Sequence, residues 1–211
     1  MILRFLFALT FLIAAAAHGE SLPLQVLEEV NLARAQPLEY AQIIATRADN
    51  SRGSEGARAV TEAVRFLQKA RPLPPLAWSP GISQAALSHA LDLGPRGGTG
   101  HTSSRGESPW DRMARFGQWQ GHAGENIDYG HSDARSIVIS LLVDNGVPSR
   151  LHRANIFSRN FRVTGIAVAP HARSGSMCVM DFASRFFEAG EERVATRGIV
   201  LRSSYSGMSF F

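Results

Sequence analysis

The sequence predicts an α+β fold, a three-layer α/β/α sandwich in which helices cover both faces of a small sheet. Three features of the chain indicate it: apolar residues recur at helical spacing in several segments, two later runs are apolar on both faces, and turn residues separate these segments. The 211 residues, of which 45% are hydrophobic and 19% charged, are enough for one domain with a sizeable core. We therefore expect one globular domain between a leader and a tail.

Residues 1–19 have the pattern of a signal peptide. Arg4 is the basic start, Phe5 to Ile13 is the apolar stretch, and Ala15 and Ala17 are the small residues before the expected cleavage. A transmembrane helix needs about 20 apolar residues, and neither this run nor any later one is that long. The sequence thus predicts a secreted, extracellular or periplasmic protein with no transmembrane span after cleavage, and an uncleaved anchor is the alternative.

Cysteine content and charge narrow the class of protein further. The only cysteine, Cys178, lies in an apolar run, so no internal disulfide is possible and we expect a buried, unreactive thiol. The net charge of +4 comes mostly from arginines scattered between Arg34 and Arg202, and no nucleic-acid-binding motif is present. The excess charge is weak evidence for an anionic partner, because a solvated arginine-rich surface explains it equally well. Nucleic acid is not an expected partner.

Apolar spacing predicts four helices in the first half of the chain. Two consecutive helices lie between Leu22 and Asp49 with a break at Pro37, and a third runs from Ala57 to Lys69. A fourth begins at Ser79-Pro80. Its inward stripe consists of Ile82, Ala85, Ala86, His89 and Leu93. We interpret the histidine in this stripe as a packed core residue, since that is commoner than a ligand on an apolar helix face.

The second half of the chain alternates loops, short helices and strands. Residues 94–106 form a Gly-rich loop that presents His101, and a short helix follows from Trp110 to Phe116. A strand at residues 122–130 carries Glu125 on its apolar face. A helix capped at Ser132-Asp133 ends at Asn145-Gly146, and two further strands occupy residues 161–169 and 177–183. We assign residues 22–183 to the domain and 184–211 to a C-terminal tail of uncertain order.

Four polar residues stand out because each lies in a short, distinctive stretch: His101, Glu125, Asp144 and His152. Two imidazoles and two carboxylates that converge in one cleft can hold a metal or move protons. Asp144 lies on the inward stripe of its helix near the C-terminal end, where the helix dipole disfavours an acid. Its position therefore suggests a nearby cation, a charged histidine or a metal, and a solvated helix end is the alternative.

Six stretches follow one another in an order typical of one family. They are AWSPGISQAALSHALDLG, GHTSSRGESPWDRMARFG, GENIDYG, LLVDNGVPSRLHRANIF, FRVTGIAVAPH and CVMDFA. On these stretches the chain resembles the CAP superfamily of cysteine-rich secretory proteins, antigen 5 and pathogenesis-related 1 proteins. It is most similar to the disulfide-free microbial branch, the SCP-like extracellular proteins. The resemblance covers nearly all of the chain between Leu24 and Ala183, and it implies an α/β/α sandwich with a small, mainly antiparallel sheet and a central cleft.

The resemblance also assigns the four polar residues to that cleft. His101 takes the first histidine position, Glu125 the first acid and His152 the second histidine. Asp144 takes the second acid position, where many family members have glutamate. Leu151 departs from the pattern, because related sequences usually have glycine before the second histidine. We expect this leucine to crowd the turn beside the cleft and to weaken metal binding.

Three functions remain open for this cleft. In the first, the two histidines and two acids bind zinc or another divalent cation. In the second, His101, Glu125 and His152 are the catalytic groups of a protease-like hydrolase, with Ser103, Ser104 or a metal-bound water as nucleophile. In the third, the fold is an extracellular module that captures a small molecule, a lipid or sterol, a glycan or a protein. A purely structural hydrogen-bond network is the alternative to all three.

Several residues beside these four complete the set of candidates. The possible cleft-lining residues are Asn126, Ser103, Arg153 and Asn155, although turn and capping roles explain them as well. The loop histidines that we expect to be solvated are His122, His131 and His171. The sequence leaves the substrate, the partner and the oligomeric state open.

Overall fold

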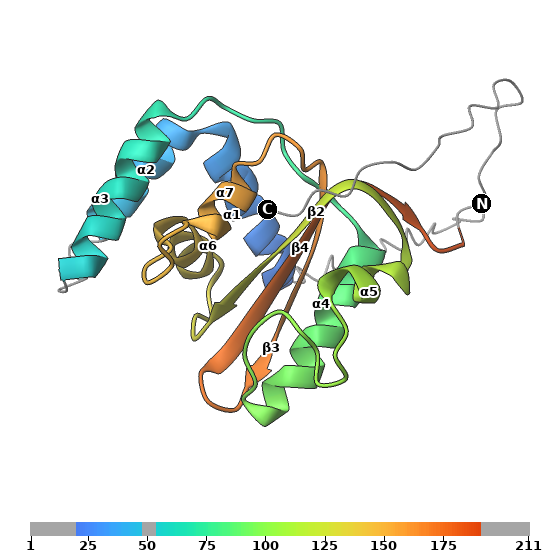
Figure 1. Cartoon of the computed structure of the whole chain (residues 1–211). Coiled ribbons are helices and arrows are strands. Elements are labelled where there is room, and N and C mark those ends of the chain that lie inside the picture. The colour runs from blue at the N-terminus through green and yellow to red at the C-terminus, as the bar shows by residue number, and fades with distance from the viewer. Residues whose placement is uncertain (1–19, 48–53, 191–211) are drawn as a thin grey trace, which may run out of the picture.

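The computed structural model describes residues 20–47 and 54–190. The expected signal peptide and residues 191–211 of the expected tail lie outside the described residues. Within them, a four-stranded sheet lies between two groups of helices (Figure 1). This arrangement confirms the predicted α+β sandwich.

The helices begin and end close to where the sequence places them. They are α1 (Leu22–Ala35), α2 (Pro37–Arg47), α3 (Ser54–Lys69), α4 (Pro80–Leu93), the short 3-10 helix η2 (Gly94–Arg96), α5 (Pro109–Ala114), α6 (Ala134–Val143) and α7 (Leu151–Ile156). The predicted helix starts have a local physical cause. Ser79 Oγ accepts a hydrogen bond from Ile82 N at the start of α4, and the Asp133 carboxylate accepts one from Ser136 N at the start of α6. The α7 helix was not predicted.

The sheet is mainly antiparallel, as the family resemblance implies. Its strands are β1 (Ala77–Trp78), β2 (Gly117–Tyr129), β3 (Val163–His171) and β4 (Gly175–Glu188), in the order β1-β3-β4-β2. Only β1 runs parallel to its neighbour among these strands, and β2 forms one edge. The β4 strand extends past the predicted end at Ala183, because residues 185–188 pair with residues 117–120 of β2.

Helices cover both faces of this sheet. The α4 and α5 helices lie on one face, and the α1, α2, α3, α6 and α7 helices lie on the other (Figure 1). The larger core lies on the second face and includes Val30, Ile44, Ile137, Leu142, Ile156, Met180 and Phe182. A smaller cluster packs α4 against the sheet through Ala86, Ala90, Ala167 and Val179. Burial on both faces explains why β3 and β4 are almost continuously apolar.

The α4 helix lies unusually close to β3 because of one glycine. A Cβ atom on Gly165 would lie 2.1 Å from Ser83 N and 2.4 Å from Ile82 C, which are backbone atoms of α4. The small alanines that α4 turns toward the sheet match this close approach. Gly165 therefore sets the distance between helix and sheet on the face that carries Glu125.

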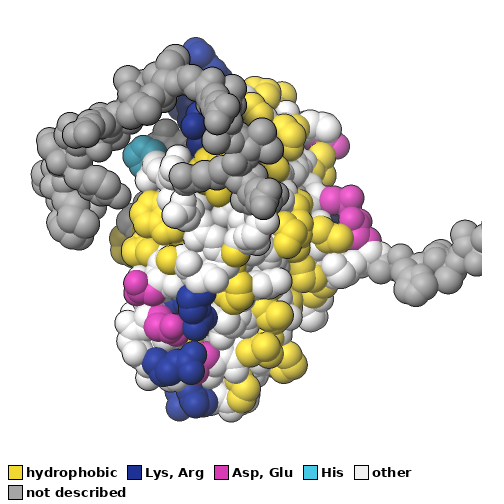
Figure 2. Space-filling model, turned by 90° about the vertical axis from the view of Figure 1, so that its right-hand side faces the viewer, with side chains coloured by type: hydrophobic (Ala, Val, Ile, Leu, Met, Phe, Trp, Pro, Cys, Tyr) yellow, Lys and Arg dark blue, Asp and Glu magenta, His cyan; other side chains and the backbone are white. Residues whose placement is uncertain are grey.

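The outer surface of the α4 and α5 side carries charges of both signs. Seen from that side, acidic and basic side chains gather together on one part of the surface, and hydrophobic side chains cover other parts (Figure 2). Several of these charges are paired, as in the contacts Arg96–Asp92 (2.8 Å) and Arg115–Glu107 (3.0 Å). Over residues 20–47 and 54–190, no helix is both long and apolar enough to cross a membrane.

Candidate functional site

The first histidine and the first acid form a direct pair. His101 Nδ1 lies 2.7 Å from Glu125 Oε1. Glu125 is buried on β2, as the strand pattern predicts, whereas the His101 side chain on its loop is 53% exposed. Because a carboxylate only accepts, His101 Nδ1 carries the proton of this hydrogen bond, and Nε2 is left as the second functional nitrogen.

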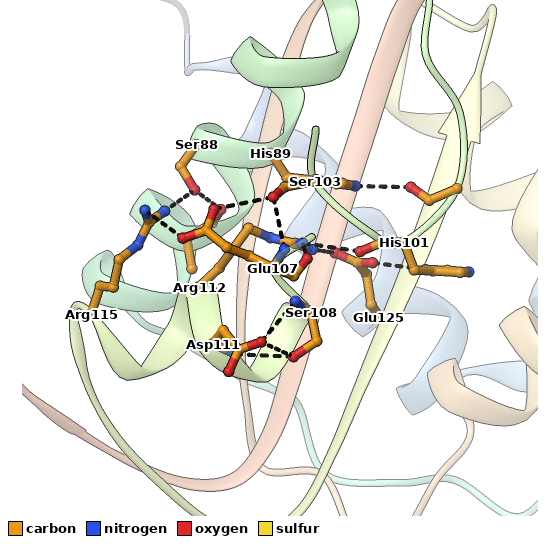
Figure 3. A network of polar contacts seen from close by, with 12 residues as sticks. Ser88, His89, His101, Ser103, Glu107, Ser108, Asp111, Arg112, Arg115 and Glu125 are labelled. Atoms are coloured by element: carbon orange, nitrogen blue, oxygen red, sulfur yellow. Dashed lines mark hydrogen bonds and ion pairs between the residues drawn. The ribbon is translucent and has the colours of Figure 1, made fainter. Parts of the chain in front are cut away.

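A buried arginine, Arg112, holds this pair in place, and no sequence motif indicated it. The Arg112 Nη2 group forms an ion pair with Glu125 Oε2, and Nη1 donates to the backbone oxygens of His101 (3.0 Å) and Glu107 (3.2 Å) (Figure 3). Arg112 is 1% exposed. Its helix begins with a capping box in which Ser108 and Asp111 bond each other's backbone N–H groups. One guanidinium thus fixes both the acid and the loop that carries the histidine.

A second buried acid, also absent from the sequence-based candidates, stands behind Glu125. Asp181 lies opposite Glu125 in the β2–β4 register and is fully buried. Burial, and then the negative charge of Glu125, raise the pKa of Asp181 well above its usual value, while Arg112 acts in the opposite direction. In the described part of the chain, the buried side-chain atoms that lack a protein partner are Asp181 Oδ1 and Oδ2, His89 Nδ1 and Arg112 Nε. They define a buried polar cluster behind the first pair.

The serines proposed as nucleophiles have structural partners instead. Ser103 Oγ donates to Glu107 Oε2 (3.1 Å) and accepts from the backbone N–H of Glu107 (3.0 Å). Ser104 Oγ donates to Asp92 Oδ1 (2.6 Å). These bonds tie the His101 loop to itself and to α4. This geometry gives a serine-based hydrolytic mechanism no support.

The second acid and the second histidine form a matching pair. His152 Nδ1 lies 2.7 Å from Asp144 Oδ1, and His152 N donates to Asp144 Oδ2 at 2.9 Å. Asp144 is 3% exposed and follows the last residue of α6. The His152 ring is thus the hydrogen-bond partner of this acid. A cation is also close by, because Arg150 Nη1 donates to the Asp144 carbonyl at 2.7 Å.

The loop between α6 and α7 has a backbone that is unusual for its residues. Asp144 (φ 57°) and Arg150 (φ 50°) are the non-glycine residues with positive φ in the described part of the chain. Such conformations cost of order 1 kcal/mol or more for residues with a Cβ and persist where surrounding contacts enforce them. The hydrogen bonds of Asp144 with His152 and Arg150 stabilise these backbone conformations. Leu151, the departure from the family pattern, is 54% exposed at the start of α7.

The two pairs lie on either side of the edge strand β2. Glu125 points toward α5, where Arg112 lies. Its neighbour Asn126 points the other way, and Asn126 Nδ2 donates to the backbone oxygen of His152 at 2.9 Å. Asn155 Nδ2 in turn donates to Asn126 Oδ1 at 2.9 Å. The structure thus brings each histidine to one acid, and the two pairs belong to opposite sides of the edge strand β2.

The candidate cleft-lining residues form hydrogen bonds that connect the segments around the site. Asn126 and Asn155 connect β2 to α7, and Ser103 closes the His101 loop. Arg153 is buried and donates to the carbonyls of Leu142 (2.5 Å) and Val143 (3.0 Å), which are the last residues of α6. Among residues 20–47 and 54–190, no group of three or more His, Cys, Asp or Glu side chains is arranged to hold a metal ion.

A cavity of about 840 Å³ lies beside the second pair. Asp144 and His152 form part of its wall, together with another pair in which His131 Nδ1 lies 3.0 Å from Asp128 Oδ2. Burial raises the pKa of Asp128, and a hydrogen bond from Ser140 opposes this rise. The apolar part of the wall consists of Val60, Ile127, Tyr129, Ile139, Leu141, Val143 and Val147. The other polar lining residues are Thr46, Arg47, Ser136, Ser140 and Asn145. The cavity wall therefore combines apolar side chains with polar ones, among them two histidines.

The three loop histidines differ in their exposure and contacts. His131 is part of the cavity wall, and His122 is exposed. The expectation of a solvated side chain is wrong for His171, which is 3% exposed. Its Nδ1 accepts from Ser174 N (3.0 Å), so Nε2 donates to the Gly98 carbonyl (2.9 Å). His171 joins the β3–β4 turn to the Gly-rich loop, and the sequence carries no local signal of that contact.

Comparison with known proteins shows to which family a chain with this fold and these histidine–acid pairs belongs. The model of the CAP family, described as the cysteine-rich secretory protein family, matches residues 27–182. The chain therefore belongs to the CAP family. No curated protein matches the chain significantly.

Solved structures give partial likenesses. An extracellular protein with an SCP domain from Bacillus anthracis is 26% identical, with a TM-score of 0.42 over 53% of this chain and 34% of that one. An outer surface protein from Borrelia burgdorferi is 18% identical, with a TM-score of 0.46 over 62% and 89%. A cysteine-rich secretory protein from Staphylococcus aureus is 13% identical, with a TM-score of 0.37 over 65% and 40%. The match spans about a third of the Bacillus protein, and the family assignment rests on the family model.

Proposed function

We propose that this protein is an extracellular CAP-domain module that binds a small amphipathic molecule, such as a lipid or a sterol, in the cavity beside Asp144 and His152. The observation that carries the proposal is the cavity of about 840 Å³, whose wall combines aliphatic side chains with polar ones that include His131 and His152. Cavities of roughly 300–1,000 Å³ with mostly apolar walls and a few fixed polar groups are typical small-molecule sites. The pattern of residues 1–19 supports a location outside the cytoplasm.

The polar part of the cavity wall suits a polar head group. Asp144 and Asp128 are each engaged by a histidine Nδ1, so the imidazole Nε2 atoms of His152 and His131 remain for a ligand. Because each imidazole is oriented by a buried acid, it meets the ligand in a fixed geometry. The aliphatic side chains of α3, α6 and the loop after α6 offer the complementary surface for a hydrocarbon portion.

Filling the cavity is expected to abolish capture. Ile139→Trp places a large ring in the cavity wall, and Val147→Phe fills it from the loop. Both variants are expected to lose co-purifying hydrophobic molecules in a solvent extract analysed by mass spectrometry. We also expect them to bind a fluorescent fatty acid at least about tenfold more weakly, a change of about 1.4 kcal/mol.

Leu38→Trp is the matched control, because Leu38 is 61% exposed and does not line the cavity. It should bind like the unmodified protein, and melting curves check that all variants fold. A clean solvent extract combined with no saturable binding of the fluorescent fatty acid by the unmodified protein would refute capture.

Divalent metal binding by His101 and His152 is the second candidate. The favouring observation is that each ring bonds a buried carboxylate through Nδ1, both at 2.7 Å. Metal-binding histidines commonly donate their other N–H group in this way, which orients the ring and raises its basicity. Imidazole nitrogen is a donor that zinc accepts, and Glu125 and Asp144 would be the orienting acids at the two histidines. A bound zinc ion would supply a Lewis acid with open positions for water.

Zinc titration by calorimetry tests the second candidate. His101→Ala and His152→Ala are each expected to weaken zinc binding at least about tenfold, because each removes a proposed ligand. Loss of the group that orients a ligand already costs about 10–100-fold in metal affinity in typical sites. His122→Ala is the control, because His122 is exposed and lies outside both pairs. Equal zinc affinity in all three variants would end the metal proposal and leave the cavity proposal untouched.

A further inference from the structure

Three arginines share one hollow at the far end of the sheet from the β3–β4 turn. The hollow has a volume of about 400 Å³ and lies where β2 has an irregular register between Gln120 and Ala123. Its wall contains Arg159, Arg162 and Arg185. The other lining residues are Gln120, Gly121, Asn160 and Ser184, so none of the lining residues in the described part of the chain carries a carboxylate. None of the ion pairs found within residues 20–47 and 54–190 involves these three arginines.

The Arg162 guanidinium is fixed by carbonyl groups instead of an acid. Its Nη1 donates to the backbone oxygens of Arg159 and, at 3.0 Å, of Phe161. These two bonds use the hydrogens of Nη1 and leave the edge formed by Nε and Nη2. That edge is the one that binds a carboxylate or phosphate group with two parallel hydrogen bonds. Its orientation is already set before any ligand arrives.

A fourth arginine adds positive charge beneath the same loop. Arg34 is 1% exposed and donates to the carbonyls of Ile156 (2.6 Å) and Ser158 (3.2 Å), just before Arg159. Burial, and then the charge of Arg162, lower the pKa of Arg34 to about 10. The loop that carries two of the three hollow arginines is therefore anchored on a buried cation, and the positive charges of Arg34 and Arg162 repel each other.

This pattern differs from the charged surface around α4 and α5. There, basic side chains face acidic ones, as in Arg96–Asp92 and Arg115–Glu107. Arg159, Arg162 and Arg185 are also exposed, but they share one concave surface and form none of the ion pairs found in the described part of the chain. Arginines grouped in this way commonly bind tetrahedral oxyanions, because each guanidinium presents donors in a fixed plane. Gln120, Asn160 and Ser184 supply neutral hydrogen-bonding groups beside them.

We propose that the hollow formed by Arg159, Arg162 and Arg185 is a binding site for a phosphate group, either as a free anion or as the head group of an anionic lipid. The site lies among residues of β2, β4 and the loop after α7, and it shares no lining residue with the cavity of the proposed function. The net charge of +4 of the whole chain favours the approach of such an anion.

The test compares charge removal inside and outside the hollow. Arg162→Gln and Arg185→Gln remove one charge each within it, and Arg173→Gln removes one from an exposed arginine in the β3–β4 turn. The probes are inorganic phosphate, followed through the arginine Nε–H signals by NMR, and vesicles of phosphatidylglycerol with phosphatidylcholine vesicles as the neutral reference. We expect the hollow variants to bind at least about tenfold more weakly and Arg173→Gln to bind like the unmodified protein, with binding weakened by added salt.

The two probes separate the sources of the phosphate. Saturable shifts of the Arg162 and Arg185 Nε–H signals with inorganic phosphate support recognition of the free anion. Binding confined to phosphatidylglycerol vesicles, and weakened by the hollow variants alone, supports the lipid head group. The proposal is overturned if neither probe binds, or if Arg173→Gln weakens binding as much as Arg162→Gln does.

Discussion

Replacing Arg112 with alanine is expected to lower the free energy of unfolding by about 3–5 kcal/mol. Arg112 is the buried cation next to the buried acids Glu125 and Asp181, and its removal leaves the Glu125 carboxylate without its compensating charge. The backbone oxygens of His101 and Glu107 lose a donor at the same time. Urea unfolding at neutral pH, followed by circular dichroism, measures the change.

Arg115→Ala is the matched control for this experiment. Arg115 lies one turn further along the chain, pairs with Glu107 and is 39% exposed, so its removal should change stability by less than about 1 kcal/mol. If Arg112→Ala were no more destabilising than Arg115→Ala, Arg112 would not be the residue that stabilises the buried cluster. A selective loss would show that the first histidine–acid pair depends on a cation supplied by the protein itself.

Replacing Gly165 with alanine is expected to cost about 3 kcal/mol or more. The added Cβ would meet the α4 backbone at 2.1 Å, and a backbone atom cannot move aside as the end of a side chain can. Either α4 shifts away from β3 or the strand bends, and both openings disturb the packing of Ala86 and Ala90 against the sheet. Thermal and urea unfolding measure this loss of stability.

Gly98→Ala separates this steric effect from the general effect of removing a glycine. A Cβ on Gly98 would meet the Leu93 side chain at 3.1 Å, and that flexible group can give way. Its expected effect is therefore within about 1 kcal/mol of zero. Similar unfolding curves for Gly165→Ala and the unmodified protein would contradict the close approach of α4 to the sheet.

Much of the fold follows from local patterns in the sequence. The spacing of apolar residues, Pro37 and the caps at Ser79 and Asp133 place helix starts correctly, because these signals act within a few residues. The end of β4 was placed too early, since residues 185–188 are stabilised by pairing with residues 117–120 and by no local preference. For the same reason the short β1 and α7 elements were not predicted.

The candidate site, like the fold, was predicted from the sequence only in part. The resemblance to the CAP family pointed to His101, Glu125, Asp144 and His152, and the structure pairs each histidine with one acid. No short sequence pattern pointed to Arg112 and Asp181, which lie beside the first of these pairs. Asp181 reaches Glu125 only through the register of β2 and β4.

The sequence by itself determined the family, the order of most helices and strands and the four polar residues of the candidate site, because these depend on residue types within short stretches. Only the tertiary structure decided what surrounds them. It placed Arg112 beside Glu125, formed the cavity beside His152, and gathered Arg159, Arg162 and Arg185 around one hollow. These arrangements depend on strand register and helix packing, in which residues far apart in the chain meet, and such contacts leave no periodic signal in the sequence.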